Sequence, residues 1–355
     1  MAMMYGTRGV KYGGIWIITL FLAGCQSSET QWFSLSGNTM GSTYHIQYSG
    51  AKNYQREIDD LLKDINDALS TYKPTSVISQ FNERGNLVIP LAKNGEPADP
   101  LQGHFFANLE EAYEIYKLSN GFFDPTVGPL VEAWGFGRAG HQSEIPDSSL
   151  IGSLLTKVGM EKVEVKSVND TLYVNGKDQQ VDLDFSALAQ GYATDRVFDL
   201  LKGKGVQDMF VEITGEVRVS GKSERGDDWI VGINVPEEEA DLKDIAARIR
   251  MHDNALATSG NYRNYYMLKG RKVWHTINPK TGYPEENNLL SATIVHPRCM
   301  TADALATASM AMGADDAIDL IRKVPGAQGY FIYRNASGEI ATFVTDNLTQ
   351  DLLPE

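Results

Sequence analysis

The chain has 355 residues, of which 42% are hydrophobic and 22% are charged, and its formal net charge is −14. This composition is ordinary for a globular protein with one large domain or two modest ones. An acidic surface argues against nucleic acid as a partner, and it means that a polyanionic ligand would need a local cation, from a metal or from a basic cluster.

The first residues have the pattern of an export signal. Arg8 and Lys11 precede an apolar run over residues 15–23 that is too short to span a bilayer. The run ends in Leu22-Ala-Gly-Cys25, which resembles a bacterial lipoprotein signal that is cleaved before Cys25 and then carries lipid on that thiol. A plain signal peptide or an N-terminal anchor is the alternative.

These features predict three parts of the chain: a signal peptide over residues 1–24, a lipid-anchored tether over 25–37, and one folded unit over 38–355. Lipid on Cys25 would leave Cys299 as the one remaining thiol. A single thiol in an exported chain forms no intramolecular disulfide, so we expect Cys299 to lie in the core.

Hydrophobic periodicity predicts the first elements of the folded unit. Alternation over residues 43–48 predicts a strand, and the small polar segment 37–42 before it predicts a loop that could admit a ligand. Residues 58–69 have the apolar spacing of an amphipathic helix, and residues 100–119 predict a second helix. The segment 122–130 is too rich in Pro and Gly for a regular element.

The stretch from Asp184 to Asp195 predicts a strand that runs into a helix through small residues. Alternation over residues 172–183 indicates the strand, and apolar spacing over 189–201 indicates the helix. Such a junction directs backbone N–H groups and the positive end of the helix at one point, which suits a phosphate. Many junctions of this kind bind nothing, so the motif needs support from the rest of the chain.

The remaining elements mix strands and helices without strict βαβ alternation, which favours the α+β class. Residues 240–250 are ambiguous between helix and strand. The predicted strands are 209–213 and 217–220 as a hairpin, 229–235, 273–277, 291–295, and 330–333 with 339–343, and the predicted helices are 301–312 and 314–322.

Asp303 and Thr307 lie four residues apart in the predicted helix 301–312, so they share one face. With Thr301 as the expected N-cap, both lie in the first turns. Two oxygen donors, completed by a carbonyl, phosphate oxygens and water, are a usual way to hold Mg²⁺. The alternative is an Asp favoured by the helix dipole, with Thr307 in the core.

His275 lies where a predicted strand meets the tight turn 278–282. A histidine there can act as a general base near neutral pH. A single histidine at the end of a strand is more often structural, so this motif alone decides nothing.

Seven motifs occur along the chain in a fixed order. They are Thr39-Met-Gly-Ser-Thr43, Phe123-Asp-Pro-Thr-Val-Gly-Pro-Leu130, Trp134-Gly-Phe-Gly137, the stretch 184–195, Thr258-Ser-Gly-Asn-Tyr-Arg263, residues 275–282 and Ala302-Asp-Ala-Leu-Ala-Thr307. Taken together, these motifs resemble the ApbE family, the FAD:protein FMN transferases, which are usually exported lipoproteins. The resemblance covers nearly the whole of the chain after the signal. It implies an ApbE-like, T-fold-like α+β arrangement of mixed sheets with packed helices in one compact catalytic unit.

The resemblance also implies roles for individual residues. Mg²⁺ would be held by the carbonyl of Ala187 and by Asp303 and Thr307, and His275 matches a histidine proposed as the base. The positions that match FAD-binding positions of the family are Met40, Tyr72, Phe122, Phe123, Asp124, Asp184, Gln190 and Ile277.

The reaction implied is transfer of FMN from FAD to a Ser or Thr hydroxyl of redox-protein subunits at the membrane, with release of AMP. The metal fits this reaction, because pyrophosphate cleavage needs neutralisation of the charge that builds on the phosphoryl oxygens. We expect the protein in the bacterial cell envelope, facing the periplasm and anchored by lipid. The alternatives are an FAD pyrophosphatase and a flavin-binding lipoprotein without catalytic activity.

Three positions depart from the family pattern. Asn278 stands where the family often has Asp, which removes a charge beside His275. Thr214-Gly215 stands where a Gly pair is frequent, which adds a Cβ in a turn. Gln190 stands where the resemblance implies Lys or Glu in some relatives, which replaces a charged side chain with a neutral amide.

Overall fold

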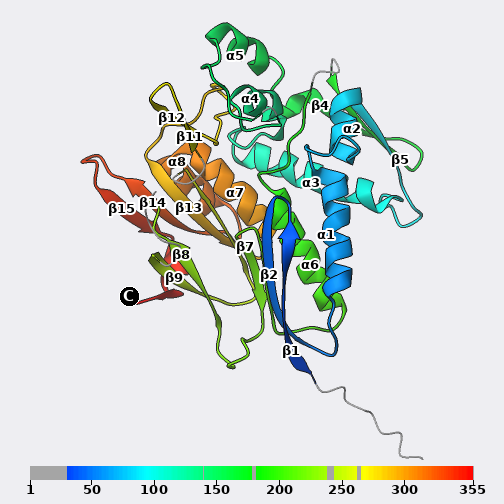
Figure 1. The fold of residues 1–355 in the computed structure, drawn as a ribbon, viewed down its shortest axis with the longest axis vertical. Coiled ribbons are helices and arrows are strands. Elements are labelled where there is room, and N and C mark those ends of the chain that lie inside the picture. The colour runs from blue at the N-terminus through cyan, green and yellow to red at the C-terminus, as the bar shows by residue number, and fades with distance from the viewer. Residues whose placement is uncertain (1–29, 139, 178–180, 238–243, 262–264, 355) are drawn as a thin grey trace, which may run out of the picture.

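The computed structural model describes residues 30–138, 140–177, 181–237, 244–261 and 265–354, and its centre is an eight-stranded antiparallel sheet (Figure 1). The strand order is β1-β2-β6-β7-β10-β13-β14-β15. The bounds are β1 Gln31–Thr39, β2 Ser42–Gly50, β6 Met209–Ile213, β7 Glu216–Ser220, β10 Ala255–Gly260, β13 Leu289–His296, β14 Gln328–Arg334 and β15 Ile340–Val344.

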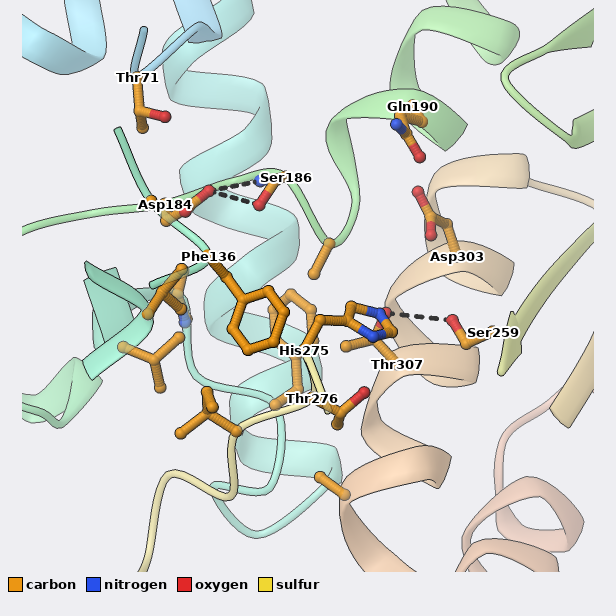
Figure 2. A pocket seen from close by; sticks show the side chains of 18 of the residues that line it. Thr71, Phe136, Asp184, Ser186, Gln190, Ser259, His275, Thr276, Asp303 and Thr307 are labelled. Carbon is orange, nitrogen blue, oxygen red and sulfur yellow. Dashed lines mark hydrogen bonds between the residues drawn. The ribbon is translucent and has the colours of Figure 1, made fainter. Parts of the chain in front are cut away.

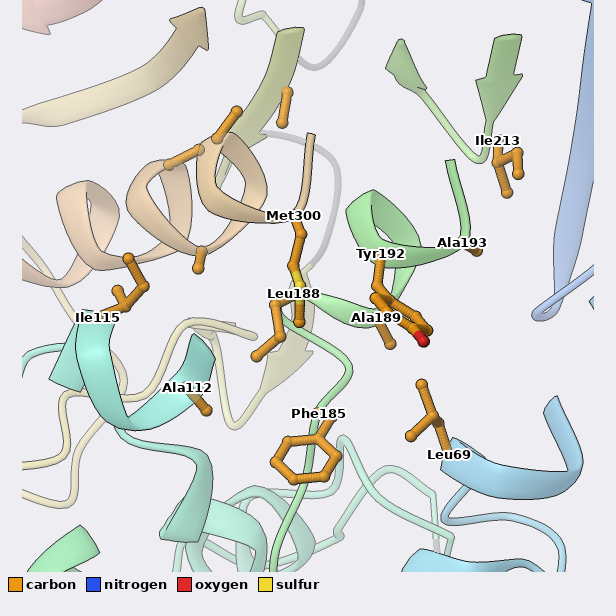
Figure 3. Packing of buried hydrophobic residues seen from close by; sticks show 14 of the residues in the cluster. Leu69, Ala112, Ile115, Phe185, Leu188, Ala189, Tyr192, Ala193, Ile213 and Met300 are labelled. Atoms are coloured by element: carbon orange, nitrogen blue, oxygen red, sulfur yellow. The ribbon is translucent and has the colours of Figure 1, made fainter. Parts of the chain in front are cut away.

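Helices cover one face of this sheet and enclose the main hydrophobic core. Phe185 and Leu188, which precede α6, point into this core between helices, as Figure 3 shows. Because the apolar faces of the helices meet the inward side chains of the strands here, this core fixes the position of α6 and α7. The helices are α1 Gln55–Leu69, α2 Val77–Arg84, α3 Pro100–Leu118, α6 Ala189–Gly203, α7 Cys299–Met312 and α8 Ala314–Lys323.

The other face of the large sheet packs against a three-stranded sheet of order β16-β9-β8. Val217 and Val219 of β7 face this second core, because successive strand residues point to opposite faces. The strands are β8 Trp229–Asn234, β9 Ile245–Met251 and β16 Leu352–Leu353. The short helix α9 Asp346–Thr349 precedes β16 in the chain.

Two smaller groups of elements complete the unit. A third core joins α4 Gly128–Ala133, α5 Ser148–Leu155, β11 Tyr265–Leu268 and β12 Arg271–Trp274. A separate three-stranded sheet consists of β3 Asn86–Pro90, β5 Thr171–Gly176 and β4 Val163–Ser167, and single 3₁₀ turns lie at Pro125–Val127 and Met160–Lys162.

The α+β class and most of the expected elements are confirmed, including the first two helices, the hairpin of β6 and β7, and the last two long helices. In the segment 240–250, which the sequence leaves ambiguous between helix and strand, the structure has the strand β9 from Ile245 onward. The helix α2 was not expected; Ser76 caps it by accepting a hydrogen bond from Ser79 N.

The tether boundary at residue 37 is wrong, because β1 begins at Gln31 and pairs with β2 along its whole length. Trp32 packs edge-on against Trp229, and Leu35 is buried, so these residues belong to the folded unit. The proposed signal peptide and Cys25 lie outside the described residues. No helix in the described part of the chain has the length and hydropathy needed to cross a bilayer.

The strand expected directly before the central helix is shorter than predicted. β5 ends at Gly176, and residues 181–183 are not in a strand. Instead, the amide side chain of Asn82 donates to Leu183 O and accepts from Leu183 N, both at 2.8 Å, and thus takes the place of a neighbouring strand. The helix itself begins at Ala189, as expected.

Two expected boundaries near the site are also wrong. Thr301 is not the N-cap of α7, because the helix begins at Cys299 and the Thr301 hydroxyl donates to Glu111 instead. β12 ends at Trp274, so His275 follows the strand rather than lying inside it.

Candidate active site

A cavity of about 880 Å³ opens between the helical layer, the third core and the ends of β2, β7 and β10. Figure 2 shows side chains that line it. Every site residue that the sequence predicts within the described part of the chain lines this one cavity. These residues are Met40, Tyr72, Phe122, Phe123, Asp124, Asp184, Ala187, Gln190, His275, Ile277, Asp303 and Thr307.

The junction before α6 is a tight turn that Asp184 closes. Its Oδ1 accepts hydrogen bonds from Ser186 N at 2.8 Å and from Ser186 Oγ at 2.6 Å. The Asp184 N–H in turn donates to Pro125 O at 2.7 Å, which ties this turn to the segment that follows α3. Ala187 lies on the wall of the cavity, two residues before the helix begins.

Asp303 and Thr307 face the cavity from α7, one helical turn apart. Asp303 is buried, and its Oδ2 accepts a hydrogen bond from Gly191 N of α6 at 3.0 Å. Burial raises the pKa of the Asp303 carboxyl to about 7, because the protein interior disfavours its charge. The Thr307 hydroxyl lies 3.4 Å from Ser259 Oγ at the end of β10.

Glu216 is a second buried carboxyl at this end of the cavity, and sequence reasoning did not single it out. It is the first residue of β7, and the Thr214 hydroxyl donates to its Oε2 at 2.7 Å. Burial raises its pKa strongly, and the charge of Asp303 adds to the effect. The hairpin turn was recognised in the sequence, but nothing there indicated that Glu216 points inward beside α7.

The donors around Asp303 fit a hard divalent cation. They are carboxylate and hydroxyl oxygens, and a cation between buried carboxyls would offset the cost of their charge. Within the described ranges, no three His, Cys, Asp or Glu side chains form a metal-binding group. Mg²⁺ usually keeps water and substrate oxygens among its ligands.

The charge of the cavity leads to the same conclusion. Among the lining residues that the structure describes there is no Lys or Arg, and the basic side chains are His141 and His275. Asp124, Asp184, Glu216 and Asp303 line the same space. A cation bound among these described carboxyls would attract an anionic ligand.

The segment after α3 forms the wall opposite α6. Phe123 is buried, and Asp124 Oδ1 accepts from Thr126 N at 2.8 Å and from Thr126 Oγ1 at 2.6 Å. Burial raises the pKa of Asp124 to about 6. Phe122 lies nearer the surface, with Lys280 Nζ 4.0 Å from the centre of its ring. Tyr72 is 66% exposed and forms part of the rim.

His275 lies against a group of aromatic side chains from the third core. The ring of Phe136 meets its ring edge-on, with 6.4 Å between ring centres. Phe136 also contacts Tyr266, on which His141 stacks with 4.2 Å between ring centres. Phe136 and His141 line the cavity. The sequence motif around Trp134 included Phe136, but no pattern indicated His141.

The structure describes all three positions that depart from the expected pattern. Asn278 is buried and closes its turn, donating to Glu285 Oε2 at 2.6 Å and accepting from Lys280 N at 2.9 Å. Thr214 has φ +57°, a left-handed conformation that is unfavourable for a β-branched residue and natural for Gly. Gln190 lines the cavity beside Asp303, as Figure 2 shows.

Part of one motif and the lipidation site cannot be placed. Tyr262 and Arg263 of the segment after β10, and Cys25, lie outside the described residues.

Known proteins resemble the chain over most of its length. The model of the ApbE family matches residues 40–331. The chain is 34% identical over 328 residues to the FAD:protein FMN transferase of Haemophilus influenzae, covering 90% of this chain and 92% of that protein. It is 36% identical over 310 residues to the FAD:protein FMN transferase of Vibrio cholerae, covering 84% and 88%. The solved structure of the flavin transferase ApbE from Vibrio cholerae superimposes with a TM-score of 0.76 at 30% identity, covering 91% of this chain and 99% of that one.

Proposed function

The chain belongs to the ApbE family, and on this premise we propose that it is an FAD:protein FMN transferase. In this reaction FMN moves from FAD to a Ser or Thr hydroxyl of an acceptor protein, and AMP is released. The observation that carries the proposal is the single cavity in which residues from Met40 to Thr307 meet. Its volume of about 880 Å³ lies within the range of sites for large cofactors.

The aromatic and polar walls would hold FAD. Phe122 and Phe123 offer apolar surface for the flavin, and Met40 and Tyr72 cover the mouth. Asp184, Asp124, Gln190 and Ile277 would orient the rest of the molecule, as the matching positions of the family imply. Because these residues come from separate segments, FAD would bind only to the folded unit.

Asp303, Thr307 and the carbonyl of Ala187 would hold Mg²⁺. When bound, Mg²⁺ neutralises the charge that builds on the phosphoryl oxygens as the pyrophosphate bond breaks. The protein contributes the fixed position of these oxygens, since Gly191 N–H holds the Asp303 carboxylate in place.

His275 would accept the proton of the acceptor hydroxyl during its attack on the FMN phosphorus. The bond between that phosphorus and the bridging oxygen breaks, and AMP leaves. An imidazole side chain is suited to accepting a proton at neutral pH. The Phe136 ring, packed edge-on against His275, would keep the imidazole directed at the cavity.

The site of action would be the bacterial cell envelope, on the periplasmic side. Residues 1–24 would be removed as a signal peptide, and lipid on Cys25 would hold the enzyme at the membrane. Its acceptors would be redox-protein subunits with an exposed Ser or Thr. With β1 counted in the folded unit, residues 25–30 would remain as the tether.

The test is incubation of the protein with FAD, MgCl₂ and a candidate acceptor domain, followed by the intact mass of the acceptor. A gain of one FMN unit supports transfer, and the same acceptor with its Ser or Thr changed to Ala should gain nothing. Free FMN and AMP without an adduct, across several acceptors, would indicate an FAD pyrophosphatase. FAD bound without any cleavage would indicate a storage protein.

A further inference from the structure

The helix α6 bears a buried carboxylate, Asp195, that the proposed reaction does not use directly. Asp195 is 6% exposed and is not among the residues that line the cavity. Both of its carboxylate oxygens accept hydrogen bonds from the start of α7. Oδ1 accepts from Cys299 N at 2.9 Å, and Oδ2 accepts from Met300 N at 3.0 Å.

These two bonds supply the cap that α7 lacks locally. The first N–H groups of a helix have no partner within the helix, and Arg298, which precedes α7, gives no side-chain cap. A carboxylate is also favoured there by the positive end of the helix dipole. The start of α7 is therefore held by a side chain of α6, rather than by its own sequence.

The contact between the two helices is close because Gly191 lies in it. A Cβ at this position would come within 2.6 Å of Cys299 O and 2.8 Å of Met300 Cα. The N–H of the same Gly191 donates to Asp303 Oδ2 at 3.0 Å. One surface of α6 thus determines both where α7 begins and where the Asp303 carboxylate is held.

Arg218 of β7 completes the arrangement. Its Nη1 lies 2.7 Å from Asp195 Oδ1, and its guanidinium lies over the ring of Phe198, 4.1 Å from the ring centre. Because its charge is paired in this way, Asp195 can remain buried and still accept both N–H groups of α7.

We propose that Asp195 is a positioning residue for the divalent cation. It fixes the offset between α6, which begins two residues after Ala187, and α7, which provides Asp303 and Thr307. The inference rests on the proposed function, because the cation belongs to that function. Mg²⁺ demands near-ideal octahedral geometry, so a small shift of α7 along α6 weakens binding of the ion without removing a ligand.

The experiment is a calorimetric titration of the full chain with MgCl₂ alone. Loss of a group that orients metal ligands typically lowers metal affinity about 10–100-fold, and we expect an effect of this order for Asp195→Ala. Asp195→Asn should lose less, because its one oxygen can still accept from α7. In the transfer assay, excess MgCl₂ should restore the rate of Asp195→Asn to near the wild-type value.

The matched control is Asp99→Asn. Asp99 caps α3 by accepting from Leu101 N at 2.9 Å, is exposed, and is not among the residues that line the cavity. This variant should lose some thermal stability and keep the wild-type affinity for MgCl₂. If Asp195 had only a structural role, its Ala and Asn variants would likewise lose thermal stability and keep the wild-type affinity for MgCl₂.

Three outcomes would overturn the inference. If Asp195→Ala and Asp195→Asn bind MgCl₂ within twofold of the wild type, Asp195 does not position the site. If the wild type binds no MgCl₂, the proposed cation site fails and the inference fails with it. If the variants do not fold, amide hydrogen exchange in the wild type is the test. Binding of MgCl₂ should slow exchange of the Cys299 and Met300 amides, because the cation site and these hydrogen bonds are coupled in both directions. Exchange that does not change with MgCl₂ refutes the role of Asp195.

Discussion

Replacing Asp303 by Asn should make the metal-free protein more stable while it removes transfer activity. Asn keeps the shape of the side chain, and its oxygen can still accept the Gly191 N–H bond. It cannot ionise, however, and a neutral amide is a poor substitute for a charged ligand of a hard cation.

The magnitude follows from the pKa of Asp303, which burial raises from 3.8 to about 7. Between these two values the unfolded chain gives up the proton and the folded chain keeps it, so the stability of the wild type falls as pH rises. A difference of roughly 3 pKa units corresponds to about 4 kcal/mol. The stability gap between Asp303→Asn and the wild type should therefore widen by up to that amount between pH 4 and pH 8, and stay constant above pH 8.

The assay is urea unfolding of both proteins in EDTA at a series of pH values. Thr307→Val is the control, because it alters the same site without changing a charge, and its gap to the wild type should not depend on pH in this way. Added MgCl₂ should stabilise the wild type and leave Asp303→Asn unchanged. The reasoning is refuted if metal-free wild type at pH 8 is as stable as Asp303→Asn.

Three further results are expected. Affinity for MgCl₂ should rise with pH through about 7, because Asp303 must lose its proton to bind the ion; a flat profile in calorimetry would contradict this. His275→Ala should lower single-turnover transfer by about 10²–10⁴-fold with FAD affinity nearly unchanged, and an equal loss of binding and rate would make His275 a ligand-binding residue. Cys25→Ser should release the protein from the membrane fraction, and a variant that stays bound with residues 22–25 uncleaved would show that no lipoprotein signal operates.

Local patterns in the sequence were sufficient to predict the parts of the site that lie within one element. The i, i+4 spacing of Asp303 and Thr307 places both on one face of α7 in the sequence as in the structure. The periodicity after residue 189 likewise gave the correct start of α6. These predictions needed only the helical repeat.

Features that depend on contacts between distant segments could not be read from local patterns. Glu216 is the first residue of a short strand, and only the packing of β7 beside α7 makes it a buried neighbour of Asp303. The local sequence predicts Thr301 as the N-cap of α7, because caps usually come from a residue next to the helix. The cap comes instead from Asp195, which lies 104 residues before Cys299 in the chain. Asn82 replaces a strand beside Leu183 in the same way.

The distribution of charge predicts positive coupling between the binding of FAD and the binding of the cation. The described walls of the cavity bear four carboxyls and no Lys or Arg, so the pyrophosphate of FAD meets repulsion without a cation. The cation in turn finds only part of its ligand set on the protein, and phosphate oxygens would complete it. We therefore predict that each ligand raises the affinity for the other by the same factor. A cavity that bound FAD through Lys or Arg would lack this coupling, and it could hold the dinucleotide without the ion needed to cleave it.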